Sequence, residues 1–448
     1  MQPLVIDRAP LTPADVADVA LRRRPVALGP AAQERLKRGR DLIDHFLRED
    51  IPVYGLTRGL GGRAVTRVAD GERDGMSAVM LRARACGGGP RFPVPAVRAF
   101  LLARLASMCQ GRAGVRPLIA ERLVDFLNKG LHPVVHEVGS VGASDLALLA
   151  EMGIAVMGEG LAEYQGEVLP AAEALRRAGL EPIRLKEKEG LGLCSANSVS
   201  AGLGALALTE ARRLLRLAEA TCVLTFEAFR ANLSPIDPRI VAARPAPGQA
   251  TAAETLHGFI AGSGLTDKGA ARRIQDPISI RCASHIFGAF HNALDFAEPH
   301  VAVEINGAGD NPAVLYEDGE IVSTGNFQTP GLAQAFDLLC ISMSQVGSIA
   351  AQRTSRMMGK RFTEEQLDEL HDALSRGDGT VRIGLALVGH NARCQAKELH
   401  LLATPASVDD SSGYDVEDHE PMTPVAVRKF WRALPFWRNI IASELIVA

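Results

Sequence analysis

Long segments with apolar residues three to four positions apart are the feature that most restricts the fold of this chain. In the segment 203–217, leucines are interspersed with Arg212, Arg213 and Arg216 at helical spacing. The same pattern extends over the segments 95–129, 199–232, 285–298, 330–358 and 381–403. Runs of this length exceed strands and the average helix. They therefore predict an all-α protein with an elongated central helical bundle.

Shorter signals predict where helices begin and where strands occur. Three tetrapeptides resemble capping boxes and predict helix starts, at Thr12–Asp15, Thr251–Glu254 and Thr363–Gln366. Strand signals are restricted to 167–170 and to a hairpin at 313–322 with Asp318-Gly319 in its turn. The chain has no repeat and no low-complexity linker. We expect a loop-rich helical region at 1–200 and a long-helix region at 201–448, joined as one continuous unit.

Composition excludes several classes of partner. The 448 residues carry a formal net charge of −3, which points to neither nucleic acid nor an anionic membrane. Seven scattered cysteines without a CxxC pair, and an N-terminus without a signal-peptide pattern, favour the reducing cytoplasm. The apolar segment 331–351 is interrupted by polar residues and is expected to be a buried helix.

Loops that combine glycine with polar residues are the candidate chemical sites. Tyr54 lies in a glycine-rich loop at 53–62, where a tyrosine can act as a general acid or base, although a simple turn explains the same pattern. In the loop 139–146, Ser144 is either a site residue or the N-cap of a helix at 145–157. Arg281 is placed either to clamp a carboxylate or to form a surface ion pair. The pair His132 and His136 lacks a third ligand at a suitable spacing, so no metal site is expected.

The order of these motifs resembles that of the aromatic amino-acid ammonia-lyases, the histidine/phenylalanine ammonia-lyase family. The resemblance covers about residues 50–440. It is carried by the motifs at 54–61, 114–117, 131–135, 139–146, 154–160, 164–166, 169–175, 188–191, 275–282, 304–312, 325–327 and 417–419. It implies an all-α homotetramer of the ammonia-lyase/fumarase-like type, whose active sites combine loops from more than one subunit.

The resemblance also implies roles for individual residues. Tyr54 matches the tyrosine that removes the β-proton, and Arg281 matches the arginine that holds the substrate carboxylate. Glu417 matches an acid near the substrate amine. Gln275 and Asn326 match polar residues that line the site. The implied substrate is therefore a small carboxylate or amino acid.

Ala143 and Ser144 match two thirds of the Ala-Ser-Gly tripeptide that cyclises into a methylidene-imidazolone group. Asp145 stands where that motif has its glycine. Glycine suits ring closure because a Cβ obstructs the compressed backbone that cyclisation requires. We therefore expect Ala143-Ser144-Asp145 not to form the usual group, and we expect no free cofactor.

Other departures from the family pattern fall in the same site. Ser195 replaces the supporting asparagine, Ile278 a tyrosine, and Arg84 and Gln328 replace histidines. Three hypotheses remain open. The chain is a carbon–nitrogen lyase, or a prosthetic-group-independent elimination, hydration or cyclisation enzyme, or a catalytically silent binding or assembly subunit.

Overall fold

The computed structural model describes residues 1–63, 65–358, 387–408 and 417–448. The chain forms two compact units. Unit 1 comprises Met1–Thr209, Glu298–Gln334 and Ala406–Arg428. Unit 2 comprises Glu210–Ala297, Ala335–Pro405 and Lys429–Ala448. Each unit is thus assembled from segments that lie far apart in the sequence.

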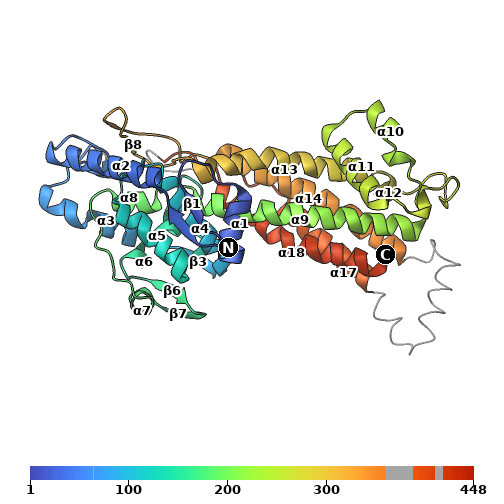
Figure 1. Ribbon diagram of the computed structural model, residues 1–448, viewed down its shortest axis with the longest axis horizontal. Coiled ribbons are helices and arrows are strands. Elements are labelled where there is room, and N and C mark those ends of the chain that lie inside the picture. The colour runs from blue at the N-terminus through green and yellow to red at the C-terminus, as the bar shows by residue number, and fades with distance from the viewer. Residues whose placement is uncertain (64, 359–386, 409–416) are drawn as a thin grey trace. The chain divides into compact units, whose positions relative to one another are not determined.

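Unit 1 contains short helices and several small groups of strands (Figure 1). Its helices are α1 (Pro13–Arg22), α2 (Pro30–Arg48), η1 (Gly61–Arg63), α3 (Asp70–Arg84), α4 (Val94–Met108), α5 (Pro117–Lys129), α6 (Leu146–Val156), α7 (Ala171–Arg177) and α8 (Glu189–Cys194). Its strands are β1 (Leu4–Ile6), β2 (Val26–Leu28), β3 (Gly88–Arg91), β4 (Leu131–Pro133), β5 (His136–Val138), β6 (Leu161–Tyr164), β7 (Glu167–Pro170), β8 (Ala313–Leu315) and β9 (Glu320–Val322).

The strands pair only locally. β1 pairs in parallel with β2, and the pairs β3–β5 and β8–β9 are antiparallel. β4, β6 and β7 form a three-stranded antiparallel sheet. The predicted strand at 167–170 and the predicted hairpin at 313–322 are therefore confirmed, and Gly319 has the positive φ of +72° that its turn requires.

The core of unit 1 lies around α4. Every residue from Ala96 to Met108 is buried, including two arginines. The Arg98 guanidinium donates to the carbonyl oxygens of Val19 and Leu127, whereas Arg104 pairs with Asp310. A buried helix can carry such charges because carbonyl and carboxylate oxygens replace the lost water.

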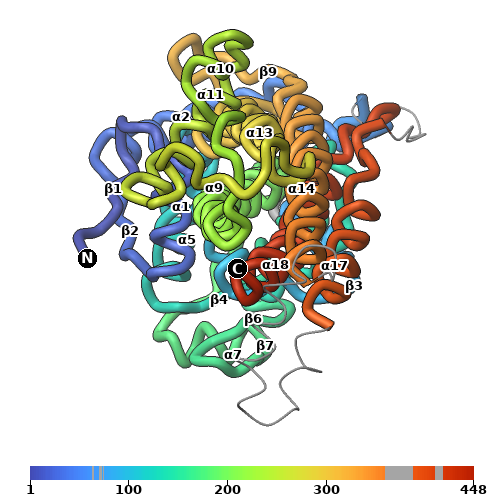
Figure 2. Tube along the Cα trace, turned by 90° about the vertical axis from the view of Figure 1, so that its right-hand side faces the viewer, coloured from blue at the N-terminus to red at the C-terminus, as the bar shows by residue number. Residues whose placement is uncertain are grey.

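Four long helices have residues in both units: α9 (Ser198–Phe229), α13 (Ala283–Asn306), α14 (Pro330–Met357) and α18 (Thr423–Val447). The other helices of unit 2 are η2 (Ser234–Ile236), α10 (Pro238–Ala243), α11 (Pro247–Ile260), η3 (Gly264–Thr266), α12 (Ile278–Arg281) and α17 (Val388–Leu402). Within unit 2 the long helices run alongside one another (Figures 1 and 2). A buried ion pair joins Arg353 of α14 to Glu444 of α18.

The long helical segments at 199–232, 285–298 and 330–358 are confirmed as α9, α13 and α14. The segment 95–129 is not one helix, since it breaks between α4 and α5, where Gly111 and Gly114 have φ values of +79° and +67°. A Cβ at Gly111 would lie 2.5 Å from the Arg35 carbonyl oxygen, so this close approach requires glycine.

Two of the predicted helix starts lie within the described residues. The capping box at Thr12 is confirmed, because Thr12 and Asp15 exchange side-chain and backbone hydrogen bonds. α11 begins at Pro247, before the predicted start at Thr251, since proline is favoured at a first helical position. The predicted start at 363–366 and part of the segment 381–403 lie outside the described residues.

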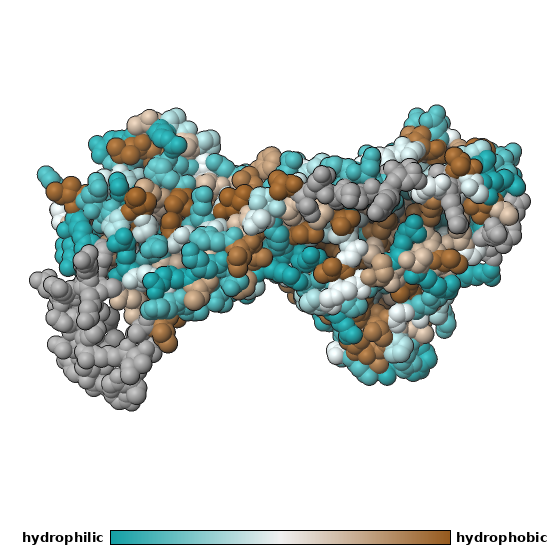
Figure 3. All heavy atoms as spheres, turned by 180° about the vertical axis from the view of Figure 1, so that it is seen from behind, coloured by the Kyte–Doolittle hydropathy of each residue, from teal (hydrophilic) through white to brown (hydrophobic). Residues whose placement is uncertain are grey.

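By length and composition, two helical stretches of the described chain would be able to cross a membrane, Glu189–Phe229 and Pro330–Met357. The most apolar part of the first is buried throughout and that of the second is mostly buried, as in the core helices of a folded protein. On the face shown in Figure 3, hydrophobic residues reach the surface in scattered small patches.

Candidate functional site

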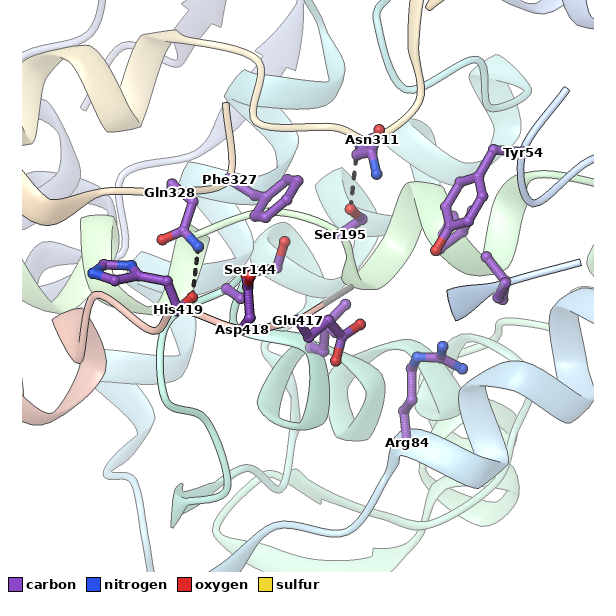
Figure 4. Close-up of a pocket in the computed structure, with 14 residues that line it drawn as sticks. Tyr54, Arg84, Ser144, Ser195, Asn311, Phe327, Gln328, Glu417, Asp418 and His419 are labelled. Carbon is purple, nitrogen blue, oxygen red and sulfur yellow. Dashed lines mark hydrogen bonds between the residues drawn. The ribbon is translucent and has the colours of Figure 1, made fainter. Parts of the chain in front are cut away.

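A pocket of about 150 Å³ in unit 1 gathers side chains from loops that are distant in sequence (Figure 4). Its lining residues are Tyr54, Leu60, Arg84, Ala143, Ser144, Leu146, Leu191, Ser195, Asn311, Phe327, Gln328, Glu417, Asp418 and His419. The structure thus brings together most of the residues that the sequence singled out in unit 1.

Tyr54 is presented by a loop whose base is anchored in the core. Val53 and Leu56 on either side of it are buried in a cluster with Ile43 and Val314. The Tyr54 side chain reaches into the pocket instead, and its hydroxyl oxygen accepts the Gly61 N–H at 3.0 Å (Figure 4). The phenol oxygen is therefore held in place at the pocket.

Gly55 fixes the approach of this loop to the pocket wall. Its φ is +65°, and a Cβ there would lie 2.5 Å from Leu191 Cδ1 and 2.9 Å from Leu60 Cδ2. Both leucines line the pocket. The glycine at this position is therefore required by conformation and by space, as the glycine-rich sequence of the loop suggested.

The turn that carries Ser144 is tightly bonded. Gly142 has a φ of +113° and its carbonyl oxygen accepts the Asn197 side-chain amide at 3.0 Å. The Ala143 N–H donates to the Glu420 carboxylate at 3.2 Å, and Ser140 Oγ donates to the Ser144 carbonyl at 3.0 Å. Ser144 itself has a φ of +61°, an uncommon conformation for a residue with a side chain.

Asp145 lies beneath the pocket and is fully buried. Its N–H donates to the Ala196 carbonyl at 2.7 Å. Its carboxylate accepts the Ser200 N–H at 2.9 Å and the Ser200 hydroxyl at 3.2 Å. Of the two alternatives for Ser144, the one in which it is the N-cap of α6 is wrong. Asp145 occupies that position, and its side chain bonds to the first turn of α9 instead.

Burial raises the pKa values of three carboxyl groups in this region. Desolvation raises the pKa of Asp145 to about 6 against the opposing hydrogen bonds from Ser200. Desolvation and, second, the charge of Asp145 raise the pKa of Glu304 to about 7. The pKa of Glu420, beside Ala143, is also raised, mainly by burial.

Arg84 is the last residue of α3 and reaches the pocket from below in Figure 4. Gln328 lies at the opposite end, where its Nε2 donates to the His419 carbonyl at 2.9 Å. Its Oε1 is buried and has no hydrogen-bond partner in the described chain. The two ends of the pocket therefore differ, one bearing a guanidinium and the other an amide.

Ser195 and Asn311 form the wall between Tyr54 and Ser144. Ser195 is the C-cap of α8, and its hydroxyl accepts the Asn311 N–H at 3.4 Å. Behind this wall, Asp310 pairs with Arg104 at 2.6 Å, and neither side chain has exposed surface. A buried ion pair therefore directly precedes Asn311 of this polar wall in the chain.

The remaining predicted residues do not line this pocket. Asn326 is exposed, and its amide donates to the Ala308 carbonyl at 3.4 Å. Gln275, Ile278 and Arg281 belong to unit 2, where Gln275 is exposed and Ile278 is 62% exposed. The Arg281 Nε is buried without a hydrogen-bond partner in the described residues.

Sequence reasoning missed half of the lining residues: Leu60, Leu146, Leu191, Asn311, Phe327, Asp418 and His419. All seven lie inside the motifs that carry the family resemblance, so membership of a motif was the available signal. The paired histidines at 132 and 136 contact separate carboxylates, Glu163 at 2.5 Å and Glu151 at 2.8 Å. Among the described residues no group of three potential metal ligands is found.

The helical fold and a polar pocket built from converging loops define a protein of the ammonia-lyase class. The structure superposes on the ergothionase of Treponema denticola, solved in complex with desmethyl-ergothioneine sulfonic acid, with a TM-score of 0.90 and 28% identity. That match covers 100% of this chain and 89% of the other. The predicted all-α fold of the ammonia-lyase type is therefore confirmed.

The chain belongs to the aromatic amino acid lyase family, whose family model matches residues 11–448. It is 34% identical over 450 residues to a histidine ammonia-lyase of Caldanaerobacter subterraneus subsp. tengcongensis, covering 100% of this chain and 87% of the relative. It is 38% identical over 450 residues to a histidine ammonia-lyase of Gloeobacter violaceus, covering 99% and 86%.

Proposed function

We propose that this protein is a carbon–nitrogen lyase that removes a β-proton from a small amino-acid substrate and eliminates the amine. The observation that carries the proposal is the convergence of Tyr54, Ser144 and Glu417 on one pocket. A base, a hydrogen-bonding hydroxyl and an acid are the groups that such an elimination requires.

Tyr54 is the base in this proposal. Its phenol oxygen is fixed by the Gly61 N–H and directed into the pocket (Figure 4). Glu417 lines the same pocket and offers a carboxylate to the ammonium group of the substrate. An amine that is held protonated leaves as neutral ammonia and needs no further proton.

We further propose that the elimination proceeds without the methylidene-imidazolone group of the family. Ring closure would need the Asp145 nitrogen at the Ala143 carbonyl carbon. That N–H instead donates to Ala196, and the buried Asp145 carboxylate is bound to Ser200. The residues at 143–145 therefore do not fit the group, and Ser195 offers a hydroxyl where the family has its supporting asparagine.

We also propose that the segment 274–281, which ends with α12 and Arg281, completes the pocket of a neighbouring copy in a homotetramer. Ile274 is 96% exposed and Ile278 is 62% exposed, an unfavourable state for two isoleucines four residues apart. Burial against another copy would cover both isoleucines. It would also bring Arg281, whose buried Nε has no partner among the described residues, to the substrate α-carboxylate.

Two experiments test this function. Ammonia release is measured with a panel of amino acids, and Tyr54→Phe is expected to lower kcat/KM by about 10²- to 10⁴-fold. The matched control Tyr164→Phe removes a hydroxyl from β6, outside the pocket, and should leave the rate unchanged. Equal rates for wild type and Tyr54→Phe would refute the assignment of the base.

An experiment with mixed oligomers tests whether two copies of the chain share one site. Tyr54→Phe and Arg281→Met homomers, each expected to have strongly lowered activity, are dissociated and reassembled together. Mixed oligomers contain some sites that have both native residues, so activity returns if the two residues come from different copies. Mixtures that stay inactive despite verified co-assembly would contradict a shared site.

A further inference from the structure

We infer that the substrate carries a second carboxylate on the carbon that loses its proton, and that Arg84 binds this carboxylate. The inference rests on the proposed elimination and names the substrate class for it, a 2-amino dicarboxylic acid. It assigns to Arg84 a role in specificity and in stabilising the charge that develops during the reaction.

The hydrogen bonding of Arg84 is the first argument. Its guanidinium makes a single long hydrogen bond, from Nη1 to the Met80 carbonyl of its own helix at 3.4 Å. It forms no ion pair with any carboxylate in the described part of the chain. Arg82, two residues earlier on α3, is bound to both oxygens of Glu159 at 2.8 and 2.6 Å. Arg84 therefore keeps most of its donors for a ligand.

The position of Arg84 is the second argument. It is the only arginine or lysine among the lining residues, and Figure 4 shows it at the same end of the pocket as the Tyr54 hydroxyl. The Glu417 carboxylate lies beside both of them in this view. A site with one guanidinium and acidic groups beside it suits a ligand with both a carboxylate and an ammonium group.

Chemistry gives the third argument. Without the electrophilic ring, the electron pair of the broken C–H bond needs another acceptor. A carboxylate on the same carbon accepts that pair and becomes a dianion, which a guanidinium stabilises with two parallel hydrogen bonds. Arg84 thereby supplies the charge stabilisation that Ala143-Ser144-Asp145 does not.

The elimination then balances without any oxidant or reductant. Deprotonated Tyr54 takes the proton from the carbon that bears the Arg84-bound carboxylate. The C–H electron pair moves into that carboxylate and returns to form the carbon–carbon double bond as the adjacent C–N bond breaks. The C–N pair leaves with nitrogen as ammonia, and the Tyr54 phenol afterwards releases its proton to water.

Pocket size agrees with a compact substrate. A volume of about 150 Å³ is comparable to that of a cavity that holds one benzene ring. A four-carbon amino dicarboxylate is closer to this size than an amino acid with a fused-ring side chain.

Equilibrium binding tests the carboxylate site without requiring turnover. Calorimetry is run on the intact oligomer with succinate, which has two carboxylates, and with butyrate, which has one. The expected result is binding of succinate about 10- to 100-fold tighter than butyrate, with this preference lost in Arg84→Met and partly kept in Arg84→Lys. Arg82→Met, on the same helix, should keep the preference. Equal affinity for the two acids, or an unchanged preference in Arg84→Met, would overturn the inference.

Turnover separates this inference from the proposed function. Aspartate and 3-substituted aspartates are compared with histidine and phenylalanine, with ammonia and the unsaturated product measured. Ammonia release from the dicarboxylates that is lowered in Arg84→Met supports both the proposed elimination and the binding of a second carboxylate by Arg84. Ammonia release from a monocarboxylic amino acid, at a rate that Arg84→Met does not change, overturns the inference about Arg84 but supports the proposed lyase function. Succinate binding that depends on Arg84, without elimination from any substrate, supports the carboxylate site and refutes the proposed lyase function.

Discussion

Asp145 is tied at both its backbone and its side chain to the connection that leads into α9. Its carboxylate accepts the N–H and the hydroxyl of Ser200 at 2.9 and 3.2 Å, and its own N–H donates to the Ala196 carbonyl at 2.7 Å. A helix N-terminus stabilises such an anion through its unpaired N–H groups. Asp145 therefore makes structural hydrogen bonds to Ser200 and Ala196 instead of taking part in cyclisation.

The pH dependence of stability should report Asp145 directly. Its pKa is raised from 3.8 to about 6, so between these values the folded protein holds a proton that the unfolded chain has lost. Stability from this group is therefore present below about pH 4 and is lost as the pH rises to about 6, by about 3 kcal/mol in all. Asp145→Asn removes the titration. The free energy of unfolding of wild type minus that of Asp145→Asn should fall across this window.

A control is needed because Glu304 titrates nearby, with its pKa raised to about 7 and partly by Asp145. The comparison is therefore repeated in a Glu304→Gln background, by denaturant unfolding at fixed protein concentration. A difference that stays flat from pH 4 to pH 7 in both backgrounds would show that Asp145 has no such shift.

Gly55→Ala should damage activity more than stability alone explains. The change places a Cβ against Leu191 and Leu60 and so displaces the Tyr54 loop. We expect kcat/KM to fall on the order of 10- to 100-fold. Gly319→Ala is the matched control, since Gly319 has a similar φ of +72° with no atom near its added Cβ. Both should lose about 1–2 kcal/mol from backbone strain. Equal activities in the two variants would contradict the role of this contact.

The fold was accessible to sequence reasoning because its longest helices carry an unbroken apolar period. The break in the segment 95–129 could not be predicted. From the sequence alone, Gly111 and Gly114 are compatible with a helix interior as well as with a turn. Only the close approach to Arg35 decides between them. How each unit is assembled was not accessible either, because it depends on contacts among segments that other parts of the chain separate in the sequence.

The candidate site was accessible to a different extent. Tyr54, Ser144 and Glu417 could be found from motifs in a fixed order. Asn311 lay within the motif 304–312 but could not be given a role, because asparagine beside proline is usually a turn residue. The hydrogen bonding of Arg84 could not be predicted either. The sequence does not show that Arg82 pairs with Glu159 while Arg84 makes a single long hydrogen bond.

The ion pair beneath the pocket should be essential for stability. Arg104→Met leaves Asp310 buried with one partner fewer, and we expect a loss of about 3–5 kcal/mol. Arg112→Met breaks a partly exposed pair with Glu317 and should cost at most about 1 kcal/mol. Thermal unfolding of both variants checks this, and similar melting temperatures for the two would argue against a structural role for the buried pair.

Intact-mass spectrometry of the purified protein tests the central claim, elimination without the family's ring, most directly. Cyclisation at residues 143–145 removes two water molecules, and mapping of the tryptic fragment 130–176 localises any deficit to this turn. We predict the full, unmodified mass in a preparation that releases ammonia from its substrate. An active preparation whose fragment lacks two waters would contradict the account.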